Sequence, residues 1–244
     1  MLPLRRWPGR RRQRGAALLM LILLVGLGAA TLITTSLNRQ GADTQRTQQS
    51  LQALSQAREA LIGYAVQHGR LPRPASVLSQ GREIAACDSE ASCTGLLPWV
   101  TLGVGGADGW NKWLRYSVSP VMVQSPINIL TVVGTKTVIG VSPQGERYYL
   151  AGFPTCNLRQ QCAAAVLISS GKHNLGVSVD GVRQQNGAVG NIDEITNDSS
   201  NNGFVSRAAS PPLIAGAGGE FDDLATWITM PAVLKPMSTA GVLK

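Results

Sequence analysis

The chain has 244 residues, and its formal charge of +8 at first suggests a protein that binds nucleic acid. Residues 1–15, however, hold six arginines and no acidic residue, and without them 16 basic and 14 acidic residues leave a net charge of +2. The basic character is therefore concentrated at the N-terminus, and we expect no nucleic-acid partner. The remaining length suits one globular domain plus an anchor.

An apolar segment follows the basic leader directly. Arg14 and Arg39 enclose 24 residues without charge, which as a helix would extend about 36 Å and could cross a hydrocarbon core of about 30 Å. The basic flank predicts that residues 1–15 stay in the cytoplasm and that everything after Arg39 lies on the far side of the membrane.

Three interpretations of this N-terminus compete. A secretory signal would be removed after the apolar run, for example before Thr31, where Gly28 and Ala30 supply small residues. An uncut membrane anchor is the simplest interpretation. In the third, cleavage between Gly15 and Ala16 removes the leader and leaves the apolar helix attached.

Beyond residue 40 an apolar stripe continues the helical pattern. Its members recur at intervals of three and four residues: Leu51, Leu54, Ala57, Leu61 and Tyr64. Gly69 can cap the helix and prolines follow closely, so the helix is predicted to end near His68.

The pattern then changes to short β-prone runs between turn residues. The strand candidates are LRYSVS, ILTVV, TVIGVS, RYYLAGF and AAVLISS. A long helix followed by strands predicts the α+β class, with a long N-terminal helix packed on an antiparallel β-sheet. Residues 171–219 are predicted to form loops with one or two short strands, and residues 221–228 a short closing helix with its acidic residues in the first turn.

Several segments, in this order along the chain, carry a family resemblance: RRRQRGAALL, AREALIGYAVQHGRLPRPA, GLLPWVTLGVGGADGWNKWLRYSVSP, AAVLISSGKHN, GFVSR and GEFDDLATWI. Over residues 10–228 the chain resembles bacterial pilin-like proteins with prepilin-type N-termini, the type IV pilins and type II secretion pseudopilins. The resemblance implies a pilin-like fold and a noncatalytic role as a minor pilin or pseudopilin. It also implies that a prepilin peptidase processes the chain between Gly15 and Ala16, with methylation of the new N-terminus.

The domain organisation then follows: a cytoplasmic leader over 1–15, a membrane-spanning and assembly helix over 16–68, and a periplasmic β-rich domain over 69–244. Other pilin or pseudopilin subunits, the prepilin peptidase and the inner membrane are the implied partners. The assembly residues on the helix would be Met20, Leu51, Leu54, Leu61 and Tyr64. The alternative from another class is a single-pass, membrane-anchored periplasmic binding protein.

Met20 departs from the family pattern, because pilin-like subunits usually carry a glutamate at this position. The resemblance implies that this carboxylate meets the N-terminal amine of a neighbouring subunit, since an unpaired charge in an apolar interior is costly. Met20 is compatible either with a diverged subunit held by apolar packing or with a subunit that starts or caps the filament.

The four cysteines fall into two pairs with equal spacing. Cys87 and Cys93 enclose five residues, as do Cys156 and Cys162, so two local disulfides are predicted in an oxidising periplasm. A zinc site with His68 or His173 is the rival, although the gaps lack the spacing of common zinc motifs.

Other patterns offer chemistry that we judge incidental. Ser169 and Lys172 match S-x-x-K, but the preceding run predicts a strand that ends in a glycine turn, and no enzyme is expected. Oxygen ligands for calcium are present at Asp193, Glu194, Asn197, Asp198 and Asn201. A solvated polar loop is the simpler interpretation of that stretch.

Overall fold

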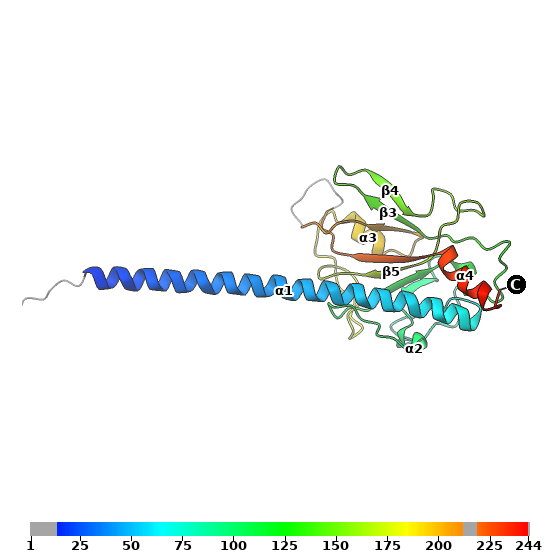
Figure 1. Ribbon diagram of the computed structural model, residues 1–244, viewed down its shortest axis with the longest axis horizontal. Helices are drawn as coiled ribbons and strands as arrows, with labels where there is room; N and C mark the ends of the chain where they lie inside the picture. Colours follow the sequence, from blue (N-terminus) through cyan, green and yellow to red (C-terminus); the bar gives the residue numbers. More distant parts are fainter. Residues whose placement is uncertain (1–13, 212–218, 244) are drawn as a thin grey trace, which may run out of the picture. The chain divides into compact units, whose positions relative to one another are not determined.

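The computed structural model describes residues 14–211 and 219–243, and it describes side chains for residues 20, 21, 24 and 25 and then from Gln40 onward. Two compact units make up the chain, Met1–Gln45 and Arg46–Lys244. One helix, α1 (Arg14–His68), contributes to both (Figure 1). It ends where the sequence predicts, because Gly69 adopts a φ of 68° and its N–H donates to the carbonyl of Ala65 at 2.9 Å.

The globular unit, Arg46–Lys244, belongs to the α+β class, and its described residues form two sheets. The first has the order β1-β2-β5-β7 and is antiparallel throughout, with β1 (Thr94–Leu96), β2 (Arg115–Val118), β5 (Ala163–Ser169) and β7 (Leu224–Thr229). The second has the order β4-β3-β6, with β3 (Thr137–Val141), β4 (Arg147–Ala151) and β6 (Gly203–Ser206). Here β3 pairs with β4 antiparallel but with β6 parallel, which the sequence did not indicate.

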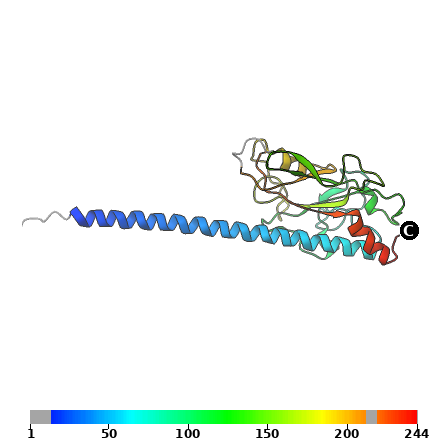
Figure 2. The ribbon, with the colours of Figure 1, turned by 45° about the horizontal axis from the view of Figure 1, so that its top comes forward.

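Strand β5 lies at the centre of the packing. All seven of its residues are buried, as expected for a continuous apolar run covered on both faces. One face, with Ala165 and Leu167, packs in the core that includes Leu54 and Leu61 of α1. On the other face Val166 and Ile168 pack with Val138 and Phe204 of the second sheet. In Figure 2 the second sheet accordingly lies on the side of β5 away from α1.

Four short helices complete the described part of this unit. They are α2 (Trp99–Leu102), the 3₁₀ helix η1 (Pro120–Val123), α3 (Ile192–Asp198) and α4 (Met230–Thr239). Strands β2, β3, β4 and β5 confirm four of the five strand predictions. The fifth, at 129–133, is wrong: Asn128 organises a turn there, because its side-chain oxygen accepts from the N–H of Leu130 at 2.9 Å and its carbonyl accepts from Thr131 and Val132.

The predicted closing helix over 221–228 is also wrong. Most of strand β7, which pairs with β5, lies in this stretch, and the helix begins only at Met230. Thr226, Trp227, Ile228 and Thr229 are residue types that favour strands. Pro231, in the first turn of α4, is the helix-start signal that the chain does carry.

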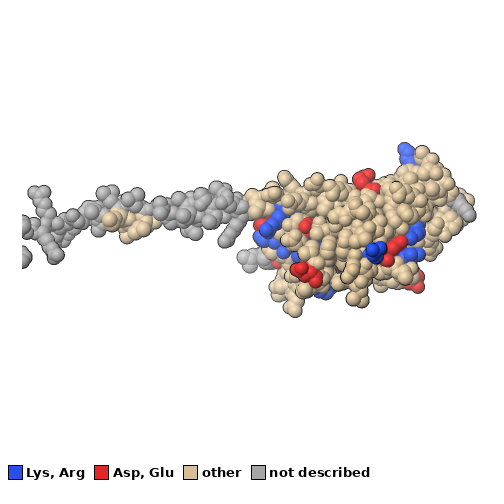
Figure 3. Space-filling view, turned by 90° about the horizontal axis from the view of Figure 1, so that it is seen from below, with Lys and Arg blue, Asp and Glu red and all other residues tan. Residues whose placement is uncertain are grey.

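Both predicted disulfides are present, Cys87–Cys93 and Cys156–Cys162. Because both pairs are oxidised, their thiols do not supply a zinc site. Two disulfides are typical of a domain that resides outside the cytoplasm. Charges of both signs are interspersed on the face of the globular unit seen in Figure 3, without a continuous basic patch there.

Candidate functional site

The first candidate site is the N-terminal part of α1. Gly15 and Ala16 fall within its helical range, but their side chains and residues 1–13 lie outside the described residues. Most side chains of the apolar segment between Arg14 and Arg39, which was predicted to span a membrane, also lie outside the described residues. Within the part of the chain that is described, no helix has the length and apolar character needed to cross a membrane.

Four side chains are described in that part of α1, and all are apolar and exposed. Met20 is 68% exposed, and Leu21, Leu24 and Val25 are exposed to a similar extent. Their spacing of one and four residues places them along one side of the helix. Burying these side chains against a neighbour would be favourable by about 25 cal/mol for each Å² of apolar surface removed from water.

The predicted apolar stripe in the later part of α1 packs within the globular unit, so Leu54 and Leu61, which were predicted as assembly residues, face the protein's own core. Leu54, Ala57 and Leu61 are buried, and Tyr64 is 9% exposed. Leu51 is an exception, since 52% of it is exposed. At about 100° of rotation per residue, Leu51 lies about 90° around the helix from the middle of the buried stripe. The stripe instead continues to Ser50, which is fully buried.

Ser50 is buried because a loop approaches α1 closely. The N–H of Gly109 donates to the Ser50 hydroxyl at 3.0 Å, and this hydroxyl donates to the carbonyl of Arg46 at 3.0 Å. The Arg46 guanidinium lies over the ring of Trp110, 5.2 Å from its centroid. The segment GADGWNKW thus holds the globular unit to its helix through contacts that the hydrophobic pattern did not reveal.

Glu83 ties the end of α1 to the chain that follows it. Its carboxylate accepts from both Nη atoms of Arg70 at 2.9 and 2.7 Å, from the Tyr64 hydroxyl at 3.2 Å and from the N–H of Arg73 at 2.9 Å. Burial alone would raise the pKa of Glu83, but these hydrogen bonds, chiefly from Arg70, lower it to about 2. Tyr64 also stacks on His68, with ring centroids 3.9 Å apart.

This geometry gives a prediction for pH dependence. Because the pKa of Glu83 is lowered from 4.5 to about 2 in the folded state, its stabilising contribution is present above pH 4.5 and is lost as the pH falls through 4.5 toward 2. Allowing for partial solvent screening, we expect a loss of about 1–3 kcal/mol. Urea unfolding of the full-length protein in detergent at pH 6 and pH 3 measures it. Glu83→Gln should remove this part of the pH dependence, and identical pH dependence in both proteins would contradict the assignment.

The second candidate site is the acidic stretch that was weighed for calcium. It is not a solvated loop, because residues 192–198 form helix α3, whose acidic residues point into protein contacts. Asp193 and Glu194 are 1% and 2% exposed. Asn197 accepts from the N–H of Val205 at 2.7 Å and donates to its carbonyl at 2.9 Å. Asp198 pairs with Arg115 and Arg183, and Asn201 accepts from the N–H of Gly203 at 3.1 Å.

Protein donors therefore occupy most of the oxygens considered for calcium, whereas Asp198 Oδ1 is buried without a hydrogen-bond donor and lies 3.8 Å from Arg115 Nη1. Glu194 accepts from Asn174, from Asn191 and from the backbone N–H of Asp222, at 3.1, 2.7 and 3.0 Å. Glu194, Asp222 and Asp223 do bring one carboxylate oxygen each within 4.8 Å of the others. Burial raises the pKa of Asp222 and, more strongly, that of Asp223. Such a shift favours a neutral carboxyl group and reduces repulsion within the cluster.

A buried ammonium group balances the same cluster. Lys112 Nζ donates to the carbonyls of Ser170, His173 and Asn174 at 3.1, 2.7 and 2.7 Å. Burial lowers the pKa of Lys112, and the nearby carboxylates, Asp222 foremost, oppose that shift. The cluster joins α3, the turn after β5 and the chain before β7, which is a structural role.

The two members of the S-x-x-K pattern contact different side chains. Ser169 is the last residue of β5, and its hydroxyl donates to Asp108 Oδ2 at 2.6 Å. Lys172 lies over Trp110, with Nζ 5.8 Å from the ring centroid. The turn between them passes through Gly171, at a φ of 56°, as the sequence indicates.

Comparison of the chain with protein-family models, curated proteins and solved structures gave no significant match.

Proposed function

We propose that this protein is a minor pilin or pseudopilin, a noncatalytic subunit that assembles into a filament through its N-terminal helix. One observation supports the proposal most. A single helix, α1, buries one face in the core of the globular unit at Leu54 and Leu61, while every side chain described near its start is apolar and exposed. The exposed apolar part then requires a membrane or neighbouring helices, and a filament subunit uses both in turn.

The length of the mature chain tests this proposal. A filament subunit processed by prepilin peptidase begins at Ala16, so the intact mass of the membrane-extracted protein should lack residues 1–15. An uncut anchored binding protein would keep the whole chain, and a secretory signal would leave a chain that starts near Thr31. Either of these masses would count against the proposal.

Position 20 bears on where the subunit sits in the filament. Met20 carries no charge that could meet the N-terminal amine of an earlier subunit. A subunit that starts the filament has no earlier amine to engage, so we place this protein at the filament tip. Immunogold labelling of intact filaments should mark one end. Regular labelling along their length would contradict the tip position but not the role as a filament subunit.

Alanine variants of two leucines on α1 distinguish an effect on folding from an effect on assembly. Leu54→Ala should destabilise the globular unit by about 2–5 kcal/mol, because Leu54 is buried in the core. Leu51→Ala should change stability by less than about 0.5 kcal/mol, because Leu51 is half-exposed. If Leu51 contacts a neighbouring subunit, this second variant should nevertheless reduce the yield of pelleted filaments. Normal filament yield with Leu51→Ala would exclude Leu51 from the assembly surface.

A further inference from the structure

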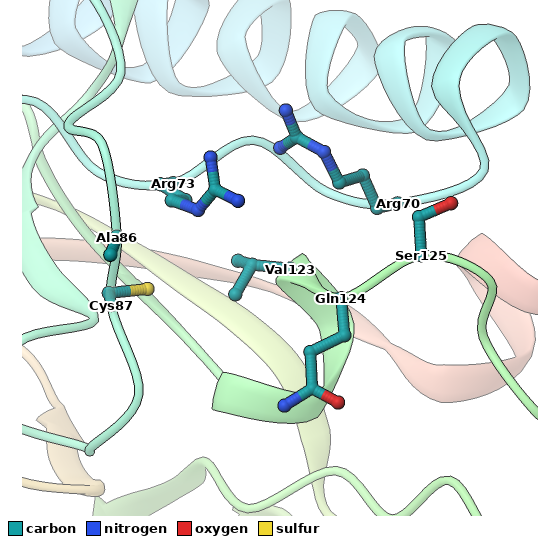
Figure 4. A pocket seen from close by; sticks show the side chains of 7 residues that line it. All are labelled: Arg70, Arg73, Ala86, Cys87, Val123, Gln124 and Ser125. Carbon is teal, nitrogen blue, oxygen red and sulfur yellow. The ribbon is translucent and has the colours of Figure 1, made fainter.

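A pocket of about 370 Å³ opens beside the end of α1. It is formed by the segment after the helix, with Arg70 and Arg73, by Ala86 and Cys87, and by the chain at the end of η1, with Val123, Gln124 and Ser125 (Figure 4). This volume lies within the range of about 300–1,000 Å³ that is usual for small-ligand sites. The Cys87–Cys93 disulfide fixes one wall.

The charges of the pocket do not cancel. Arg70 is held by a two-point ion pair with Glu83, and the low pKa of Glu83 keeps that partner charged at neutral pH. Arg73 already gives its backbone N–H to Glu83, but its guanidinium approaches the same carboxylate only to 3.9 Å. Among the described residues the Arg73 side chain has no closer partner. The pocket thus carries one positive charge that the protein does not neutralise.

Two neutral polar side chains also line the pocket, on the far side of Val123 and of Arg70 from the Arg73 guanidinium. Gln124 and Ser125 are exposed, and their side chains have no hydrogen-bond partner in the described parts of the chain. Figure 4 shows Val123 between the two guanidinium groups and the Gln124 amide. Val123 and Ala86 are apolar, and the sulfur of Cys87 is bonded to Cys93. The pocket therefore combines a guanidinium, neutral polar groups and a small apolar surface.

We propose that this pocket binds a carboxylate that carries a small apolar group, as the last residue of an extended peptide does. A guanidinium binds a carboxylate through two parallel hydrogen bonds, and one negative charge matches the one unneutralised positive charge. A phosphate dianion would leave an excess negative charge next to Glu83, which is unfavourable. The apolar group lies against Ala86, which is the exposed apolar residue of the pocket lining, since Val123 is only 3% exposed. This inference does not depend on the filament role.

Fluorescence anisotropy of the full-length protein in detergent tests the proposal, with an N-terminally labelled tetra-alanine peptide as the probe. The peptide with a free C-terminus should bind at least about tenfold more tightly than the same peptide with an amidated C-terminus, because the amide cannot form the ion pair. Competition by acetate or free alanine as strong as that by unlabelled peptide would assign the site to a small carboxylate. Competition by peptide alone would assign it to a chain end.

Arg73 and Arg82 provide a matched pair of variants. Arg73→Gln should weaken binding about tenfold or more, whereas Arg82→Gln, with the same change of charge at an exposed residue outside the pocket, should change it by less than about twofold. Arg73→Lys keeps the charge and should retain part of the affinity, and circular dichroism checks the fold of each variant. Equal effects of the two Gln variants, equal binding of the amidated peptide, no binding at millimolar concentration, or stronger competition by inorganic phosphate would each overturn the proposal.

Discussion

Replacing Gly109 by alanine is expected to destabilise the globular unit by about 2–4 kcal/mol, although the change adds only one methyl group. A Cβ atom at Gly109 would lie 2.1 Å from the carbonyl oxygen of Arg46 and 2.8 Å from its carbonyl carbon. Both atoms belong to the backbone of α1, which cannot move aside as a flexible side chain would. Separating the loop from the helix would also break the hydrogen bond from Gly109 to the buried Ser50 hydroxyl.

Urea unfolding of the full-length protein in detergent measures this effect. Gly105→Ala is the control, because no atom lies within 4 Å of the position that its Cβ would occupy. We expect this control to change the free energy of unfolding by less than about 0.5 kcal/mol. Similar stabilities of the two variants would show that the loop at Gly109 has room for a Cβ atom beside the Arg46 carbonyl, and would contradict the close approach described here.

The sequence predicted the elements whose patterns are local. The helical period placed Leu54 and Leu61 on one apolar stripe, which the structure shows packed in the protein's own core, and the apolar run at 164–170 identified a strand. The period placed Leu51 on the same stripe and missed Ser50, because the face that a helix turns toward its core depends on the partner surface. The partner here is Gly109, 59 residues further along the chain. A hydrophobic periodicity cannot reveal a hydrogen bond between residues that lie so far apart in the sequence.

The acidic segments were misassigned for a related reason. Asp222 and Asp223 suggested the first turn of a helix, and residues 193–201 a polar loop, because isolated carboxylates are normally exposed. In the structure Glu194 and Asp223 are buried, and their partners come from distant segments. The start of α3 left a trace in the sequence, since Asn191 precedes two acidic residues, a pattern typical of a helix N-terminus. The hydrogen-bond donors that bury these carboxylates left no comparable pattern in the sequence.

Asp193→Ala tests whether these acidic residues are structural, and it should destabilise the globular unit by about 3–4 kcal/mol. The Asp193 side chain is 1% exposed and accepts from Arg207 Nε at 2.7 Å as well as from Arg147. The Arg207 side chain is only 4% exposed and lies over the ring of Phe221, 4.4 Å from its centroid. Removing the carboxylate would leave a buried guanidinium without its ionic partner, although Arg207 would keep its hydrogen bond to Ser210.

Urea unfolding of the full-length protein, with and without a calcium chelator, separates the two roles considered for Asp193. Asp180→Ala is the control, because Asp180 is exposed and has no ionic partner among the described residues, and it should change stability by less than about 0.5 kcal/mol. If the arginine pairs explain the burial of Asp193, the chelator should leave the unchanged protein as stable as before. If Asp193 instead binds calcium, the chelator should destabilise the unchanged protein about as much as the substitution does, and it should have little further effect on Asp193→Ala.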